Sequence, residues 1–141
     1  MKRNARAHWE GDLKNGNGTL FTDSGVLEGQ QYSFKTRFES GKGTNPEELI
    51  GAAHAGCYAM ALSMILGDEG YKANHIDAEA AVELKEVDGA PTITAVALTV
   101  VASIPDIDED AFLKAAEAAK KDCPVSRLLD AEITLDARLV D

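Results

Sequence analysis

The chain has 141 residues, of which 45% are hydrophobic and 27% charged, and its formal net charge at pH 7 is -10. This composition is close to that of an average soluble globular protein and excludes a disordered or fibrous chain, while the length suits one domain spanning residues 1–141. The acidic residues are spread along the sequence, so charge argues against a nucleic-acid backbone or an anionic membrane surface as a partner.

The first third of the chain predicts short strands separated by turns. The N-terminal segment has basic residues with no apolar stretch behind them, so we expect no secretory signal and a cytoplasmic protein. Strands are predicted at residues 2–10, 18–22 and 32–39, with the turn-forming sequences KNGNG and DSGVLEG between them. In the third strand aromatic and polar residues alternate, which places Arg37 on its polar face.

A long apolar helix is predicted from about Pro46 to Leu66. Asn45 is a typical N-cap, and Glu48 three positions later completes a capping-box signature. The uncharged run over residues 49–66 reaches the length of a membrane span. It consists mostly of Ala and Gly and has acidic residues on both sides, so we predict a central helix buried on nearly all sides in a soluble protein.

The second half of the sequence predicts a β-hairpin and a closing strand. Residues 75–87 and 92–104 are rich in alternating and β-branched residues and are joined by the turn sequence DGAP. Residues 131–140 alternate in the same way and form the last predicted strand.

Two helices are predicted between this hairpin and the last strand. Asp106 and Glu109 form a capping-box signature for a helix that ends near Lys121. A short helix then begins at Pro124, with Cys123 at or beside its N-cap. The order of elements predicts an α+β fold with mainly antiparallel strand pairing.

The two cysteines are the candidate reactive residues. Cys57 lies inside the apolar helix, where burial raises a thiol pKa, so it packs as a small hydrophobic residue unless an external cation stabilises its thiolate. Cys123 sits at a predicted helix N-terminus with Lys120, Lys121 and Arg127 nearby, all of which favour a thiolate. Local arguments therefore favour Cys123 as the nucleophile.

Other polar residues have ordinary structural interpretations. His54 and Cys57 are three residues apart on one helix face, a spacing that suits two metal ligands, but no further ligand pair is evident and we expect no metal or other cofactor. Taken by itself, the position of Arg37 on a polar strand face predicts a solvated surface charge. Glu47 and Glu48 at the helix start are favourable to its dipole.

Several stretches of the sequence resemble the family of osmotically inducible protein C (OsmC) and organic hydroperoxide resistance proteins. In chain order they are AHWEGDLKNGNGTL, GVLEGQQYSFKTRFE, NPEELIGAAHAGCYAMALSMIL, CPVSRLL and AEITLDARL. They span nearly the whole chain and fit the OsmC branch of the family better than the organic hydroperoxide resistance branch. The resemblance implies an intertwined homodimer in which β-sheets wrap two central helices, with active sites at the subunit interface.

The resemblance also implies a thiol-dependent peroxidase that acts on organic hydroperoxides in stress defence. Cys57 matches the peroxidatic cysteine and Cys123 the resolving cysteine, which reverses the preference from local arguments. Arg37 matches the arginine that activates the thiolate, and Glu47 matches the glutamate that holds this arginine. The expected partners are an organic hydroperoxide and a thiol reductant, either a dithiol or a lipoylated protein.

Helix geometry adds a constraint to this assignment. Glu47 and Cys57 are ten residues apart on the predicted helix, about 15 Å along its axis, which a glutamate cannot span. One site containing Arg37, Glu47 and Cys57 therefore needs a broken helix or a second copy of the chain, and we predict an obligate twofold dimer. The candidates to line an apolar substrate pocket are Phe34, Phe38, Met60 and Met64.

Two alternatives stay open from the sequence. The first is a non-catalytic, stress-induced binding or structural protein on the same scaffold, with both cysteines serving as packing. The second is a metal-binding protein that uses His54 and Cys57.

Overall fold

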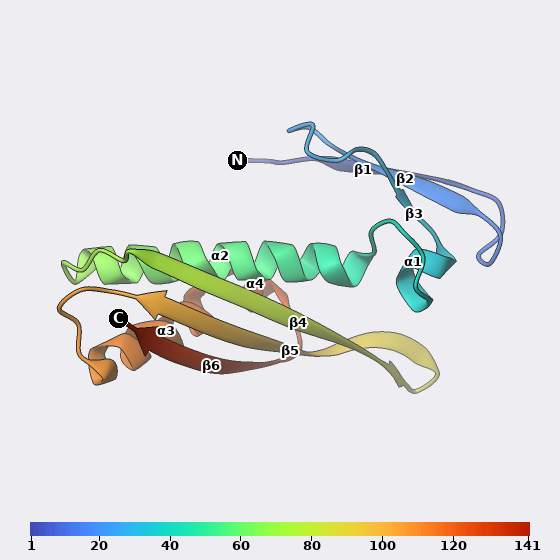
Figure 1. Ribbon diagram of the computed structural model, residues 1–141. Coiled ribbons are helices and arrows are strands. Elements are labelled where there is room, and N and C mark those ends of the chain that lie inside the picture. The colour runs from blue at the N-terminus through green and yellow to red at the C-terminus, as the bar shows by residue number, and fades with distance from the viewer. The chain divides into compact units, whose positions relative to one another are not determined.

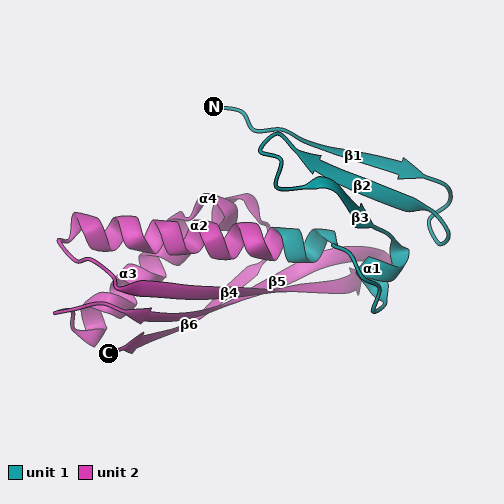
Figure 2. Ribbon diagram, turned by 45° about the horizontal axis from the view of Figure 1, so that its top comes forward, with its two compact units in different colours: residues 1–49 teal, residues 50–141 magenta.

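The computed structural model describes residues 1–141 and divides into two compact units, residues 1–49 and residues 50–141 (Figure 2). Each unit contains one three-stranded sheet. Helices and strands are mixed along the chain, so the predicted α+β class is confirmed (Figure 1).

The first unit is built on an antiparallel meander. Its strands are β1 (Ala5–Glu10), β2 (Asn17–Thr22) and β3 (Glu28–Tyr32), in the order β1-β2-β3. A short helix, α1 (Phe34–Phe38), follows β3. The first two strands lie close to their predicted ranges, and the third ends where α1 begins.

The prediction of a strand over residues 32–39 is wrong beyond its first residue. Ser33 and Thr36 form a reciprocal capping box, in which the Thr36 N–H donates to Ser33 Oγ and the Ser33 N–H donates to Thr36 Oγ1, at 3.3 and 2.8 Å. The aromatic residues that suggested a strand also fit a helix, because Phe34 and Phe38 are four apart and their rings stack on one side of it, 4.9 Å apart. Arg37 therefore projects from a helix.

Helix α2 (Pro46–Asp68) has the ends that its sequence predicts. The Asn45 side chain accepts a hydrogen bond of 2.8 Å from the Glu48 N–H. At the C-terminus the Tyr71 N–H donates to the Leu66 carbonyl, and Gly70 adopts a φ of 87° that favours glycine. The helix runs unbroken for 23 residues.

Burial of α2 differs from the prediction. One face is buried in the single chain while the opposite face is open, with Met60 and Met64 76% and 62% exposed. The prediction of burial on nearly all sides is wrong for one copy, because the sheet of the second unit covers only one side of the helix. By length and composition α2 could also cross a membrane, a test that core helices of soluble proteins pass as well. The buried residues of α2 are Gly51, His54, Tyr58, Leu62 and Leu66.

The second sheet begins with the predicted hairpin of β4 (His75–Val87) and β5 (Ala90–Ser103), paired antiparallel along their length. The chain then passes through α3 (Glu109–Asp122) and α4 (Pro124–Leu128) to β6 (Glu132–Val140). This helical crossover returns the chain to the start of β5, so β6 pairs parallel to β5. The sheet order is β4-β5-β6, and antiparallel pairing predominates in the molecule as predicted.

The N-terminus of α3 is two residues later than predicted. Asp108 is the N-cap, and its carboxylate accepts a 2.8 Å hydrogen bond from the Ala111 N–H. Asp106 instead adopts a left-handed φ of 62° in the preceding turn. Both aspartates stand at a position in the sequence that suits an N-cap. Asp108 takes this role because Asp106 lies in the turn that precedes the helix.

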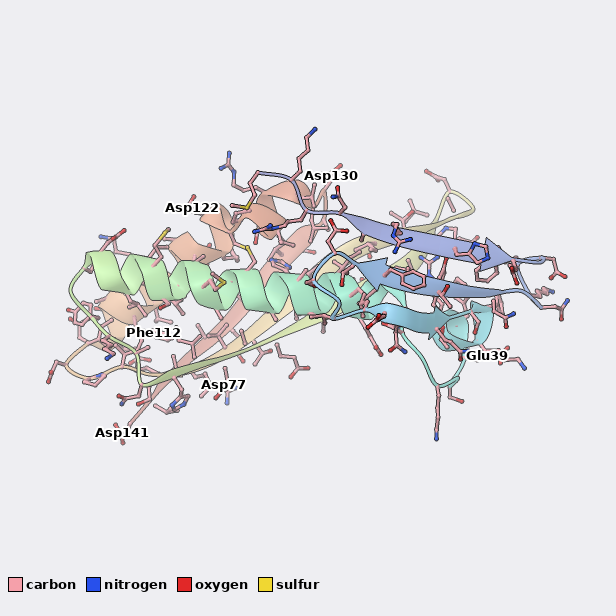
Figure 3. The ribbon with its side chains drawn as sticks, turned by 90° about the horizontal axis from the view of Figure 1, so that it is seen from above. Glu39, Asp77, Phe112, Asp122, Asp130 and Asp141 are labelled. Carbon is pink, nitrogen blue, oxygen red and sulfur yellow. The ribbon has the colours of Figure 1, made fainter.

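One apolar core lies on a single face of the second sheet, where alternate residues of β5 meet α2 and α3. Phe112 of α3 is fully buried in it (Figure 3). The acidic residues labelled in that figure are all exposed, which agrees with a negative charge spread over the surface. The buried core residues include Tyr58, Leu62, Leu66, Leu98, Val100, Ala102, Phe112, Ala115, Ala116 and Ala119.

Candidate functional site

The two cysteines meet in the second unit. Cys57 lies in the middle of α2, and Cys123 lies at the junction of α3 and α4, where it is the N-cap of α4. Both are free thiols, and they are close enough for each to shift the pKa of the other. Cys123 is completely buried, whereas Cys57 is half-buried. The fold thus brings together two sulfurs that are 66 residues apart in sequence.

The two thiols titrate as a pair because each influences the ionisation of the other. Burial is the main cause that raises the pKa of Cys57, and the neighbouring Cys123 raises it further. Burial opposes ionisation of Cys123 too, but hydrogen bonds from Cys57 and from Val125 and Ser126 outweigh it and lower the pKa of Cys123. In the single chain, Cys123 is therefore the more acidic thiol.

The cause of this shift differs from the one that the sequence suggested. The groups that lower the pKa are the Cys57 thiol, the first N–H groups of α4, which have no partner within the helix, and the Ser126 hydroxyl. Lys120 is engaged elsewhere, since its Nζ lies 2.7 Å from Glu117 Oε1. Hydrogen bonds, more than nearby cations, favour the Cys123 thiolate.

A buried histidine adjoins the cysteine pair. His54 is completely buried one turn before Cys57, and its Nε2 lies 2.7 Å from Ser126 Oγ. Burial lowers the pKa of His54, so the imidazole is neutral near pH 7. The structure arranges no group of three His, Cys, Asp or Glu side chains to hold a metal ion.

Arg37 and Glu47 form an ion pair in the first unit. Arg37 Nε donates to both carboxylate oxygens at 3.1 and 3.3 Å, and Arg37 Nη2 donates to Glu47 Oε1 at 2.7 Å. The Glu47 side chain is 13% exposed and that of Arg37 is 35% exposed. Glu48 points to solvent, so Glu47 is the acid that holds the arginine. A multidentate contact of this kind fixes the orientation of the guanidinium plane.

An aromatic pocket of about 250 Å³ adjoins this arginine within the first unit. Arg37 lines it and also lies over the ring of Phe38, 5.2 Å from the ring centre. Phe34 and Phe38 line this pocket, whereas Met60 and Met64 are exposed on α2. The other lining residues are Trp9, Leu13, Tyr32, Ser33 and Pro46.

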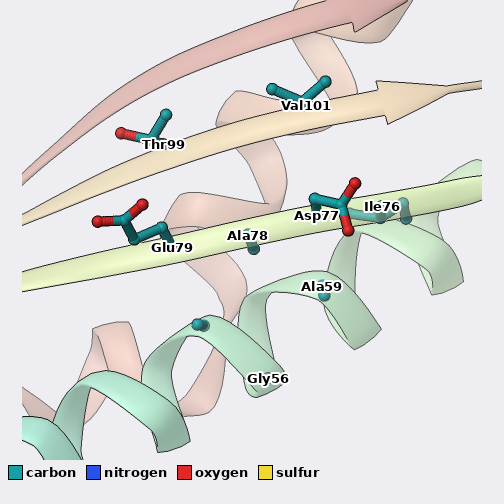
Figure 4. Close-up of a pocket in the computed structure, with 9 residues that line it drawn as sticks. Gly56, Ala59, Ile76, Asp77, Ala78, Glu79, Thr99 and Val101 are labelled. Atoms are coloured by element: carbon teal, nitrogen blue, oxygen red, sulfur yellow. The ribbon is translucent and has the colours of Figure 1, made fainter.

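A groove of about 500 Å³ runs between α2 and β4 (Figure 4). Gly56 and Ala59 line it from the helix, and Asp77 and Glu79 from the strand. It has no cysteine, histidine or arginine among its lining residues. The groove therefore contains no thiol and no cationic side chain.

The structure gathers the four residues singled out from the sequence into two pairs, one in each unit. Cys57 meets Cys123, and Arg37 meets Glu47. Sequence analysis missed Ser126, which contacts both His54 and Cys123. The available signal was its place three residues after a cysteine N-cap, where a side chain can reach back to the capping residue.

Comparison with known proteins agrees with this architecture. Residues 39–138 match the family model described as OsmC-like protein. The chain is 53% identical over 139 residues to the peroxiredoxin OsmC of Escherichia coli, covering 99% of this chain and 97% of that protein. It is 28% identical over 111 residues to the organic hydroperoxide resistance protein OhrB of Bacillus subtilis, covering 78% of this chain and 79% of that protein.

A solved structure extends the likeness to the whole fold. An OsmC-like protein of unknown function from Vibrio cholerae superposes with a TM-score of 0.78 at 16% identity, covering 98% of this chain and 99% of the other. That likeness concerns the fold alone. The sequence match and the fold together show that the chain belongs to the OsmC-like family.

Proposed function

We propose that this protein is a thiol-dependent peroxidase that reduces organic hydroperoxides to alcohols in defence against oxidative and osmotic stress. The names of two relatives, a peroxiredoxin and an organic hydroperoxide resistance protein, support this activity. The observation that carries it is the contact between the thiols of Cys57 and Cys123, one reachable and one fully buried. Free thiols also suit the reducing cytoplasm, where we place the protein.

Cys57 is the proposed peroxidatic residue. A hydroperoxide can reach this half-buried sulfur, whereas the buried sulfur of Cys123 is closed to it. The Cys57 thiolate attacks the distal oxygen of the hydroperoxide, a sulfur–oxygen bond forms and the O–O bond breaks. The alkoxide takes a proton and leaves as an alcohol, which leaves a sulfenic acid on Cys57.

Cys123 is the proposed resolving residue. Its sulfur attacks the sulfur of the Cys57 sulfenic acid, so that a disulfide forms and water leaves. The disulfide protects Cys57 from further, irreversible oxidation. A dithiol or a lipoylated protein then reduces the disulfide by thiol exchange, with the two electrons coming from its own thiols.

Arg37, held by Glu47, is the proposed activator of the Cys57 thiolate. Burial raises the pKa of Cys57, so the reactive form needs a cation from outside its own helix. Because α2 is unbroken, Glu47 lies about 15 Å along the axis from Cys57 of the same copy. We therefore propose that the Arg37–Glu47 pair of a second copy completes the site.

A homodimer is the corresponding proposed assembly. The open face of α2, with two exposed methionines, is an apolar surface that a second copy would remove from water. The same guanidinium would donate to the peroxide and to the departing alkoxide, stabilising charge as the O–O bond breaks. Arginine suits this role because it keeps its charge when desolvated and binds a carboxylate through several donors.

The aromatic pocket beside Arg37 supports an apolar substrate. Its rings offer burial to an alkyl or aryl tail, at about 25 cal/mol per Å² of apolar surface removed from water. Hydrogen peroxide has no such tail, so we expect it to be a poorer substrate than cumene hydroperoxide.

The test is consumption of cumene hydroperoxide with a dithiol as the reductant. We expect catalytic turnover in the wild type and none in Cys57→Ser. Absence of turnover in the wild type at several dithiol concentrations would contradict the peroxidase and favour a non-catalytic role. Turnover retained in Cys57→Ser would assign the nucleophile to Cys123.

A further inference from the structure

A buried chain of polar groups leads from α2 to the sulfur of Cys123. His54 is completely buried, and its Nε2 lies 2.7 Å from Ser126 Oγ. Ser126 is the third residue of α4 and is itself buried, and its hydroxyl and backbone N–H lie near enough to the Cys123 sulfur to lower the pKa of that thiol. His54, Ser126 and Cys123 therefore belong to one buried polar cluster, in which a hydrogen bond joins His54 to Ser126.

The unpartnered ring nitrogen of His54 indicates the direction of these bonds. Nδ1 is buried and has no hydrogen-bond partner. A proton on Nδ1 would be a buried unpaired N–H, which is rarer in proteins than a buried unpaired acceptor. The proton therefore resides on Nε2 and is donated to Ser126 Oγ, which leaves the Ser126 hydroxyl proton for the Cys123 sulfur.

We propose that His54 is a positioning residue for the resolving cysteine, orienting the Ser126 hydroxyl so that it donates to the Cys123 sulfur and stabilises the thiolate. This inference rests on the proposed peroxidase function. In the resolving step the Cys123 thiolate attacks Cys57, the S–S bond forms, the S–O bond breaks, and the departing hydroxide takes a proton to become water.

The same hydrogen bond also assists the reduction of the disulfide, in which Cys123 is the leaving group. When a reductant thiolate attacks the Cys57 sulfur of the disulfide, the S–S bond breaks and Cys123 leaves as a thiolate. A leaving thiol of lower pKa departs faster. His54 would thus support both halves of the cycle through one hydroxyl without touching a reacting atom.

The groups around the Cys123 sulfur are suited to this role. They are the Cys57 thiol from α2 and, from α4, the N–H groups of Val125 and Ser126 together with the Ser126 hydroxyl. Burial keeps His54 neutral, so it acts as a hydrogen-bond donor and not as a charge. Removing the oriented hydroxyl would leave the other donors in place and weaken the thiolate in a graded way.

The test is an ultraviolet titration of thiolate absorbance in the reduced, full-length Cys57→Ser protein, in which Cys123 is the one thiol that titrates. His54→Phe in this background fills the space but orients no hydroxyl, so the midpoint of the Cys123 step should rise by about one pH unit, equivalent to a tenfold loss of thiolate at a fixed pH. Ser126→Ala should give a similar rise. His54→Gln, whose amide N–H lies near the position of Nε2, should restore most of the midpoint of the Cys57→Ser protein.

Tyr58→Phe is the matched control, because it removes another buried hydrogen bond of α2, the 3.1 Å contact with the Ala116 carbonyl, and is not among the groups that shift the pKa of Cys123. It should lower stability and leave the midpoint unchanged. An unchanged midpoint in His54→Phe, or in Ser126→Ala if the first variant does not fold, would overturn the inference. A rise in His54→Gln equal to that in His54→Phe would overturn it as well.

A second readout separates this inference from the proposed function. In a single turnover with cumene hydroperoxide, His54→Phe should form the Cys57 sulfenic acid at the wild-type rate and the disulfide about tenfold more slowly, in proportion to the lost thiolate. A wild type that consumes no hydroperoxide would contradict the peroxidase, while the titration would still decide the role of His54.

Discussion

Replacing Glu47 by glutamine tests whether the ion pair with Arg37 prepares the arginine for catalysis. In the structure three donor–acceptor contacts of 2.7 to 3.3 Å join the guanidinium to the carboxylate. Glutamine keeps the length of the side chain and one oxygen acceptor but loses the charge and the second acceptor. The guanidinium is then free to rotate away from the orientation that the pair imposes.

The size of the effect follows from the exposure of the two side chains. A hydrogen bond to a charged group contributes about 1.5–3 kcal/mol, and the Arg37 side chain, which is 35% exposed, places this contact at the lower end. A loss of about 1.4 kcal/mol in the transition state corresponds to a tenfold fall in rate. We expect Glu47→Gln to lower the second-order rate constant for cumene hydroperoxide by about tenfold.

Stopped-flow oxidation of the reduced protein measures this rate constant directly. Glu48→Gln is the matched control, because Glu48 is adjacent and exposed, and only its backbone N–H caps the helix. It should react as the wild type does. A rate for Glu47→Gln within twofold of the wild type, or an equal fall in Glu48→Gln, would refute the reasoning.

Three further changes have defined outcomes. Cys123→Ser should oxidise once and then proceed to a sulfinic acid on Cys57, seen by mass spectrometry; a stable sulfenic acid under excess hydroperoxide would count against resolution by Cys123. Leu62→Ala, at a fully buried position, should lower the free energy of unfolding in urea by about 2–5 kcal/mol, and a loss below 1 kcal/mol would show that the α2 core is loosely packed. Burial lowers the pKa of His54 from its ordinary value of 6.5 in the folded protein. As pH drops below about 6.5, the unfolded chain therefore binds a proton at His54 that the folded protein does not, and the free energy of unfolding should fall. His54→Gln should remove that part of the slope in urea titrations between pH 5 and pH 7, and an unchanged slope would assign it to other groups.

The elements that the sequence predicts well are those with local chemical signals. The N-terminus of α2 is specified by Asn45, whose side chain accepts from the Glu48 N–H; this is one half of the predicted capping box, and the exposed Glu48 side chain makes no return bond. The long β4–β5 hairpin follows from alternation and a turn sequence. The strand predicted at residues 34–38 is wrong because two aromatic residues four apart fit the repeat of a strand and that of a helix, and only the cap at Ser33 distinguishes the two structures.

The site illustrates a different limit. Sequence spacing cannot show that Cys57 and Cys123 meet, because a hairpin and a helix of the second unit separate them along the chain. The resemblance to a family supplied that pairing, as it did the roles of Arg37 and Glu47. Neither sequence spacing nor the resemblance predicts the hydrogen bond between His54 and Ser126, since this bond depends on how α4 packs against α2.

The most direct test of the thiol chemistry is to treat the reduced protein with one equivalent of cumene hydroperoxide and map its cysteines by mass spectrometry. We expect loss of both free thiols, release of the alcohol, and a disulfide that joins Cys57 to Cys123. Unconsumed hydroperoxide with both thiols still free, or a disulfide that links other pairs of sulfurs, would contradict it.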